Sequence, residues 1–227
     1  MSAAAGLRER ARRAGDWCRA RPIRTAFAVL AVVVVGVLGL RRDTVRAIVR
    51  DELGVRRVEA FADLIEAAAR EAAVDPHLVA AIVFMESRGQ VGAVSSAGAL
   101  GLMQLMPAAA SDAAKRLGLA EPSAEQLLSD PALNLRLGCQ HLAWLLEHRG
   151  AWSLEQVLVA YHAGRVKLMR WMEEAGGWRA WRSRQLRSER RGEPHAGSLA
   201  YAQRALAMCA EFRERGVVEN PQGIVTP

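Results

Sequence analysis

Apolar residues recur at helical spacing along most of the chain that follows residue 56. Val58, Phe61, Leu64, Ile65 and Ala68 lie three or four positions apart, which is the periodicity of an amphipathic helix. No useful stretch alternates between apolar and polar residues, as a half-buried strand would. The pattern therefore predicts an all-α protein.

Residue signals at helix ends divide this region into separate helices. Asp75-Pro76 and Asp130-Pro131 each place an N-capping carboxylate before a proline at the first helical position. We expect helices over 76–87, 107–118, 131–149, 165–175 and 199–215, and a further one after the capping box of Ser153 and Gln156. A polar loop or flap is expected over 176–197.

An apolar segment lies between two arginine clusters near the N-terminus. It covers residues 23–40, of which 25–40 are uncharged. Seven arginines precede residue 25, and Arg41 and Arg42 follow residue 40. As a helix it would span about 27 Å against about 30 Å of hydrocarbon, a gap that flanking arginines can close. We expect a transmembrane helix, retained as a signal anchor because no A-x-A-like cleavage site follows. A cleaved signal peptide and a buried soluble helix are the alternatives.

Composition limits the class of protein further. The chain has 227 residues, of which 51% are hydrophobic, enough for a packed core. Its net charge of +7 favours a polyanionic partner such as nucleic acid, anionic lipid or a cell-wall polymer. Cys18, Cys139 and Cys209 lack metal-ligand spacing, so neither a metal nor another cofactor is expected. A Cys139–Cys209 disulfide and two small buried thiols both remain open.

Glu86 is the first candidate for chemistry. It follows the apolar run AAIVFM near the end of its helix, where its carboxyl is partly desolvated and far from the helix N-terminus. Both conditions raise the pKa of a carboxyl group, as a general acid requires. The alternative is an ordinary helix-end glutamate that is solvated or paired with Arg88.

The stretch after Glu86 has the composition of a cleft wall. Residues 87–107 contain four glycines, several large apolar side chains and no acidic residue. A third element, AYHAG at 160–164, places a tyrosine and a histidine at a helix end before a glycine. A buried, glycine-rich loop beside a lone carboxylate predicts an active-site cleft.

These elements resemble the signatures of soluble-lytic-transglycosylase-type domains: ES at 86–87, GALGLMQLMP at 98–107 and AYHAG at 160–164. The resemblance covers residues 56–215 and implies an all-helical, goose-lysozyme-like catalytic domain. It also implies a peptidoglycan lytic transglycosylase, which cleaves the MurNAc-β-1,4-GlcNAc bond and forms a 1,6-anhydroMurNAc end. A hydrolytic muramidase and a catalytically weak peptidoglycan-binding or assembly module are the alternatives.

The resemblance assigns roles to individual residues. Glu86 takes the position of the catalytic acid, which later acts as a base, and the substrate's own 2-acetamido group replaces a second carboxylate. Either Asp63 or Asp130 could still fold close and supply that carboxylate. Seven further positions would bind the substrate or hold the acid, namely Ser87, Ser95, Met103, Gln104, Tyr161, His162 and Tyr201.

The sequence also departs from the family pattern. Gly89 and Val91 stand where the family usually has Phe and Pro, and His162 replaces the asparagine of AYNAG. Arg165 and Val166 replace the usual Pro-Gly. We expect these changes to alter substrate contacts and catalytic strength without removing the acid.

Tryptophan and arginine gather in the expected flap. Trp171, Trp178 and Trp181 lie near the arginines between 179 and 191, a composition that suits a surface facing the wall or lipid. A solvated basic loop is the alternative, and nucleic acid is not expected as a partner. His141 and His148 share a helix face and are interpreted as surface or capping residues.

The location of peptidoglycan predicts the organisation of the chain. We expect a cytoplasmic tail over 1–22, the anchor over 23–40, a connector over 41–55, the catalytic domain over 56–215 and a disordered tail over 216–227. The protein would cross the inner membrane once, with its N-terminus in the cytoplasm and its catalytic domain in the periplasm. Its partners would be glycan strands, the inner membrane and a cell-wall or secretion machinery.

Overall fold

The computed structural model describes residues 42–147, 152–190 and 197–224. The basic tail and the apolar segment 23–40 therefore lie outside the described residues. No helix within those three ranges is both long and apolar enough to cross a bilayer. The chain divides into two units, 1–50 and 51–227, and in the first unit residues 42–50 form helix.

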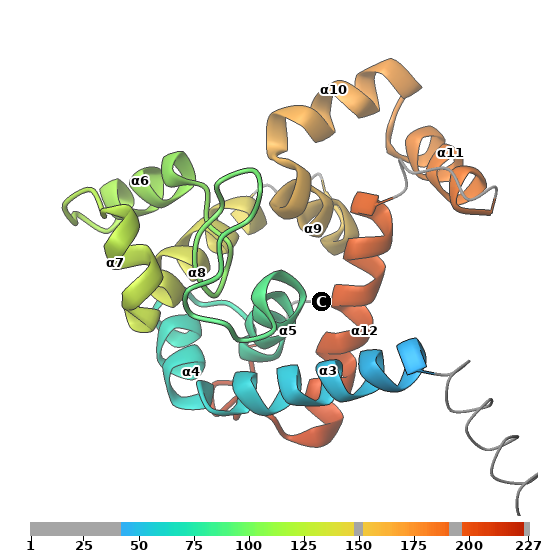
Figure 1. Ribbon diagram of the computed structural model, residues 1–227. Coiled ribbons are helices and arrows are strands. Elements are labelled where there is room, and N and C mark those ends of the chain that lie inside the picture. The colour runs from blue at the N-terminus through green and yellow to red at the C-terminus, as the bar shows by residue number, and fades with distance from the viewer. Residues whose placement is uncertain (1–41, 148–151, 191–196, 225–227) are drawn as a thin grey trace, which may run out of the picture. The chain divides into compact units, whose positions relative to one another are not determined.

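The described part of the chain is helical and contains no strand, apart from isolated bridges at Leu100 to Val94 and to Leu105. The all-α prediction is confirmed, and residues 42–55 of the expected connector are helical. In chain order the helices are α3 (Arg42–Glu59), α4 (Ala62–Glu71), α5 (Pro76–Ser87), α6 (Pro107–Arg116), α7 (Ala124–Ser129), α8 (Pro131–Glu147), α9 (Leu154–Ala163), α10 (Arg165–Ala175), α11 (Trp178–Arg190) and α12 (Gly197–Arg215) (Figure 1).

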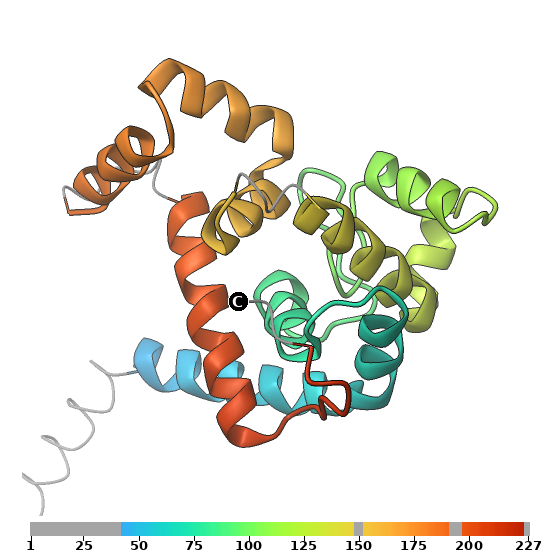
Figure 2. The same ribbon diagram turned by 180° about the vertical axis from the view of Figure 1, so that it is seen from behind.

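Helix α5 forms the centre of the second unit. Ten of its twelve residues are buried, because it is apolar on all sides rather than on one face. It packs against α12 on one side and α4 on another, as Figures 1 and 2 show. Its C-terminal end carries Glu86, so the core of the protein positions this carboxyl group.

The start of α5 is held by a buried carboxylate. The Asp75 side chain accepts a 2.9 Å hydrogen bond from the main-chain N–H of His77, which is the capping geometry that the sequence predicts. Its second oxygen accepts a 2.6 Å hydrogen bond from Arg213 on α12. Asp75 therefore ties α5 to α12 through a charge-assisted contact in the core.

The segment expected to be a loop over 176–197 contains helix α11 instead. Trp181 is buried and stacks on both Trp171 and Trp178, with ring centroids 5.6 and 5.1 Å apart. The three indoles therefore pack against one another between α10 and α11, with Trp181 buried and Trp171 and Trp178 partly exposed. Arg182 joins α11 to α9 through a 2.6 Å contact with Glu155.

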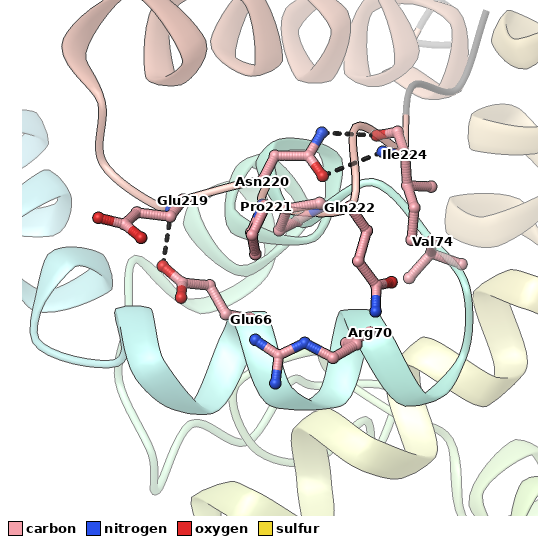
Figure 3. A pocket seen from close by; sticks show the side chains of 9 residues that line it. Glu66, Arg70, Val74, Glu219, Asn220, Pro221, Gln222 and Ile224 are labelled. Atoms are coloured by element: carbon pink, nitrogen blue, oxygen red, sulfur yellow. Dashed lines mark hydrogen bonds between the residues drawn. The ribbon is translucent and has the colours of Figure 1, made fainter.

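Residues 216–224 also differ from the expected disordered tail. Val217 and Val218 are buried, and the main-chain N–H of Glu219 donates a 2.6 Å hydrogen bond to Glu66 on α4. The Asn220 side chain closes a turn through two hydrogen bonds to Ile224 (Figure 3). The cavity beside this turn has a volume of about 10 Å³, which is room for about one water molecule. This small cavity is no candidate for a substrate site.

The two cysteines in the described residues are free. Cys139 lies on α8 and Cys209 on α12, and both are buried. Burial raises the pKa of each thiol, so both remain protonated and act as small core residues. The Cys139–Cys209 disulfide that the sequence left open is not formed.

Candidate active site

Glu86 is the penultimate residue of α5 and remains partly exposed. The helix ends at Arg88, whose left-handed backbone (φ 50°) turns the chain away from the helix axis. Arg88 does not pair with Glu86; its guanidinium contacts Asp51 at 3.0 Å and lies over the Phe84 ring. The alternative of an ordinary ion-paired helix end is therefore wrong.

Burial raises the pKa of Glu86 to about 7, and the Tyr201 hydroxyl offsets part of this increase. That hydroxyl is itself buried and makes no hydrogen bond of standard length and angle within the described residues. It therefore lies near the carboxyl group without a well-formed bond to it. Burial, followed by the Glu86 charge, raises the pKa values of Tyr161 and Tyr201 well above their usual range. Both phenols are thus neutral neighbours of the carboxyl group.

The loop 88–106 is fastened to α5 and α8 by buried polar side chains. The Ser87 hydroxyl contacts the carbonyl of Leu102 at 2.8 Å and that of Val83 at 3.1 Å. The amide of Asn134 on α8 accepts from the N–H of Met103 and donates to the carbonyl groups of Leu100 and Leu127. The glycine-rich stretch is consequently a rigid wall. Sequence reasoning missed Asn134, because nothing local distinguishes it from a surface asparagine.

Gly101 shows why the loop needs glycine at that point. Its φ of +77° is unfavourable for other residues, and a Cβ atom would lie 2.1 Å from the Asn134 side-chain nitrogen. Gly101 therefore lets the loop backbone lie directly against α8. The loop is stabilised further by paired main-chain hydrogen bonds between Leu100 and Leu105, both 3.0 Å long.

Gln104 occupies a strained position at the tip of this loop. Its φ is +47°, in the left-handed region that non-glycine residues seldom adopt. Its side-chain amide donates to the carbonyl groups of Ala93 and Gly101, at 3.0 and 2.9 Å. The amide oxygen accepts no hydrogen bond from the described residues and can accept one from a ligand.

The AYHAG element lies across from the loop. The Tyr161 hydroxyl donates a 2.9 Å hydrogen bond to the Met103 carbonyl. The neighbouring His162 ring stacks on Tyr201, with centroids 4.3 Å apart. Partial burial and the Lys167 charge lower the pKa of His162, so this ring is neutral at physiological pH.

A cleft of about 950 Å³ extends along this wall. Gln104, Tyr161 and His162 line it, whereas Glu86 lies beside Tyr161 and is not among the lining residues. The cleft also contains His141 and Trp144 of α8, which were not predicted as site residues. Burial, followed by the Arg116 charge, lowers the pKa of His141 to about 4, so it is a neutral hydrogen-bonding ring rather than a cation.

Other predicted site residues take structural positions. The Ser87 and Met103 side chains are buried, and Met103 contributes to the site through its main-chain N–H and carbonyl groups. The Ser95 hydroxyl accepts a 2.9 Å hydrogen bond from the Ala99 N–H and closes a turn. These three residues shape the loop, whereas Gln104, Tyr161 and His162 present atoms to the cleft.

Carboxylates are scarce at this site. Among the described residues that line the cleft, Asp112 is the one acidic residue, and it contacts Lys115 at 3.7 Å. Asp130 instead caps α8 through the Leu133 N–H, and Asp63 lies exposed on α4. No cluster of metal-binding side chains occurs in the ranges that the structure describes. The arrangement suits proton transfer by a single carboxyl group beside a cleft.

The chain as a whole is similar to proteins of a known family. Endo-type membrane-bound lytic murein transglycosylase A of Salmonella typhimurium is 34% identical over 121 residues, which cover 52% of this chain and 59% of that protein. The chain thus spans less than two thirds of the length of this relative. The family model for the transglycosylase SLT domain matches residues 63–183, more than half of the chain.

Solved structures show the same fold. The 70 kDa soluble lytic transglycosylase SLT70 of Escherichia coli superposes with a TM-score of 0.56 at 26% identity, over 67% of this chain and 24% of that one. An inactive mutant of the lytic transglycosylase Slt of Pseudomonas aeruginosa gives 0.55 at 22% identity, over 69% and 24% of the two chains. With its helical fold and the matched segment enclosing Glu86, the glycine-rich loop and AYHAG, the chain belongs to the transglycosylase SLT domain family.

Proposed function

We propose that this protein is a peptidoglycan lytic transglycosylase in which Glu86 acts first as acid and then as base. The observation that carries the proposal is the position of Glu86, a single desolvated carboxyl group with a pKa of about 7 beside the cleft. At neutral pH both of its protonation states are populated, as a group that donates and then accepts a proton requires. The relatives described above are lytic transglycosylases, which supports the same chemistry.

The proposed reaction begins with the protonated carboxyl group. Glu86 donates its proton to the glycosidic oxygen, and the bond from this oxygen to C1 of MurNAc breaks. The carbonyl oxygen of the 2-acetamido group forms a bond to C1 as the leaving sugar departs. Among the described residues that line the cleft, Asp112 is the only carboxylate, and it is well exposed, so assistance by the substrate fits this site better than a second carboxylate.

The second step uses the carboxylate that the first step leaves. Glu86 removes the proton from the C6 hydroxyl, whose oxygen attacks C1 and displaces the acetamido oxygen. The product is a 1,6-anhydroMurNAc end, formed without consumption of water, and Glu86 regains its proton. The Tyr201 hydroxyl stabilises the carboxylate between the two steps, since it lowers the pKa of Glu86.

The remaining site residues have positioning and binding roles in this proposal. Gln104 offers its amide oxygen to a sugar hydroxyl or N–H, and its strained backbone holds the oxygen in place. Tyr161 keeps a hydroxyl oxygen beside Glu86, and His162 presents a neutral ring to the cleft. Ser87, Ser95 and Met103 hold the loop in the conformation that these contacts require.

We also infer the cellular location from this reaction. Residues 23–40 anchor the protein in the inner membrane, with the N-terminus in the cytoplasm and residues 41–227 in the periplasm, where peptidoglycan lies. The name of the Salmonella relative, membrane-bound, supports association with a membrane. A reporter fused after residue 227 that is active only when exported tests this orientation.

The decisive experiment is a product assay with the full chain in detergent and purified peptidoglycan. Muropeptides that are one water lighter than hydrolysis products, and that disappear with Glu86→Gln, are the expected result. Asp112→Asn is the matched control on the cleft, and it should retain activity because the proposed reaction uses no second carboxylate. Reducing-end products would instead indicate a muramidase. No release of product by a folded wild-type protein that still binds peptidoglycan would indicate a binding or assembly module.

A further inference from the structure

Helix α3 carries an apolar face that is exposed to solvent. The apolar face is formed by Val45, Ile48, Val49 and Leu53, which are 47–63% exposed. They are four of the eight large exposed apolar residues in the part of the chain that the structure describes. Successive residues of an α-helix are turned by about 100°, so the four side chains share an arc of roughly 140°. Exposed apolar residues that gather on one helix in this way mark an interaction surface.

The buried side of α3 lies elsewhere on the helix. Gly54, Val55 and Val58 are buried, and by the same rotation they fall outside the arc of the apolar face. Gly54 lies so close to Phe84 of α5 that a Cβ atom there would be 2.9 Å from the ring. The contacts that hold α3 in the second unit therefore leave the apolar face exposed.

Arginines border the apolar face along one edge. Arg46, Arg50 and Arg57 are exposed and lie about 20–60° beyond Leu53 around the helix axis. An arginine side chain can lay its apolar stem on hydrocarbon while its guanidinium group reaches a phosphate. A helix with an apolar face and a bordering row of arginines is typical of the surface of an anionic membrane.

One acidic residue, Glu52, lies between the positions of the apolar face. Its carboxylate contacts Arg56 at 3.9 Å and Arg215 at 3.7 Å. Two arginines therefore compensate its charge, and the face does not repel a negatively charged surface.

The position of α3 in the chain indicates what covers the apolar face. The uncharged run of residues 25–40 ends two positions before α3 begins at Arg42. With that run in the inner membrane, the first turns of α3 lie at the bilayer surface, within reach of acyl chains and headgroup phosphates. Lipid is therefore the partner that is both nearest to the apolar face and complementary to it in charge.

We propose that α3 lies along the surface of an anionic bilayer, with its apolar face in the acyl boundary and Arg46, Arg50 and Arg57 on lipid phosphates. The inference rests on the membrane location given with the proposed function, and it adds a second contact with the bilayer. The helix is unbroken from Arg42 to Glu59. Lipid contact over residues 45–53 therefore keeps the catalytic unit, which begins at residue 51, within a few residues of the membrane.

The test measures how deep single positions of α3 lie in the bilayer. The full chain is reconstituted in vesicles of phosphatidylethanolamine and phosphatidylglycerol. Cys18 is replaced by Ser, while Cys139 and Cys209 are buried and stay in place. A nitroxide is attached to one introduced cysteine at a time, and its accessibility to oxygen and to a water-soluble nickel complex gives its depth. Thermal unfolding confirms that each labelled protein is folded.

Four labelled variants replace the residues of the apolar face, and Thr44→Cys is the matched control on the same helix. Thr44 is exposed but lies outside the arc. Labels on the apolar face should lie about 5–10 Å below the headgroup boundary, whereas the Thr44 label should remain accessible to nickel. In vesicles of phosphatidylcholine, which carry no net charge, the labels on the face should become shallower.

Three results would overturn the proposal. A depth that decreases steadily from residue 44 to residue 53, without a helical period, would mean that α3 stands upright on the bilayer. Equal depth in the two kinds of vesicle would refute the role of the arginines. Labels that are accessible to nickel, with spectra that sharpen when unlabelled protein is added, would show that a second copy covers the face.

A label at Val34→Cys, within residues 23–40, tests the anchor separately. It should be accessible to oxygen and protected from nickel. Accessibility to nickel at Val34 would contradict the proposed membrane location, and the inference about α3 with it. Labels on α3 that stay in water beside a protected Val34 would overturn the inference alone. The anhydro-product assay reports on the proposed activity independently of these labels.

Discussion

The Tyr161 hydroxyl donates a 2.9 Å hydrogen bond to the main-chain carbonyl of Met103, a residue 58 positions earlier in the chain. The bond joins the end of α9 to the tip of the loop that follows α5. Met103 is also held through its N–H, which donates to Asn134. The backbone at Met103, next to Gln104, is therefore held by both α9 and α8. These two helices together determine where the Gln104 amide points.

Tyr161→Phe removes this bond and leaves the Met103 carbonyl without a donor. We expect the free energy of unfolding to fall by about 1 kcal/mol and kcat/KM to fall about tenfold as the Gln104 loop loosens. Urea unfolding and the anhydro-product assay measure the two effects. Unchanged activity with reduced stability would show that the bond has no influence on the site.

Tyr201→Phe gives a contrasting result, because the Tyr201 hydroxyl makes no well-formed hydrogen bond to the described residues but lowers the pKa of Glu86. Wild-type kcat/KM should decline above pH 7 as Glu86 loses the proton that the first step needs. In Tyr201→Phe this decline should move to higher pH, with little change in stability. A profile that moves to lower pH would contradict the assigned role of the hydroxyl.

Glu86→Gln should stabilise the protein in alkaline but not in acidic solution. The pKa of Glu86 rises from 4.5 in the unfolded chain to about 7 in the folded one, so the folded state binds the extra proton between these values. The contribution of Glu86 to the free energy of unfolding is fully present below pH 4.5 and is lost as the pH rises through 7. Gln mimics the neutral form, and the variant should therefore be more stable by about 1–3 kcal/mol at about pH 8. Melting temperatures at about pH 4.5 and pH 8 measure the difference; an equal gain at both would refute the linkage.

Gly101→Ala should be far more damaging than Gly92→Ala. The added methyl group would collide with Asn134 and force a residue other than glycine to adopt a positive φ, whereas Gly92 faces open space without this constraint. We expect a loss of at least about 2 kcal/mol for Gly101→Ala and a change within about 0.5 kcal/mol for Gly92→Ala. Denaturant titration compares the two. Similar losses would mean that the loop tolerates displacement from α8.

Several elements could be predicted from local sequence because their causes are local. Asp75 before Pro76 predicts the start of α5, and the Ser153–Gln156 capping box predicts that of α9. Ser123 and Gln126 form the same box at α7, which was overlooked although the pattern is present. The burial of the candidate acid was also predictable, since an apolar helix that ends in glutamate places the carboxyl group at the edge of the core; its proposed role came from the resemblance of ES, GALGLMQLMP and AYHAG to the family signatures.

Other features depended on contacts between distant residues. Nothing near residue 180 predicts that three tryptophans stack on one another, and so α11 was expected to be a flap. Residues 216–224 contain Pro221 and Gly223, which favour an irregular tail, but they contact α4 through the Glu219 N–H. His141 was interpreted as a surface residue, and only packing against Trp144 and Tyr161 makes it part of the cleft.

The sequence by itself determined the helical class and the main helix boundaries, because periodicity and capping act over a few residues. It also singled out Glu86 as the candidate acid, through its place at the end of an apolar helix and the resemblance of the motifs around it to a known family. Only the tertiary structure decided that Tyr201 lies near Glu86, that Asn134 fixes the loop, and that His141 lines the same cleft as Gln104. These relationships join segments separated by many residues. Their free energy comes from burial and hydrogen bonding that exist only once the helices have packed.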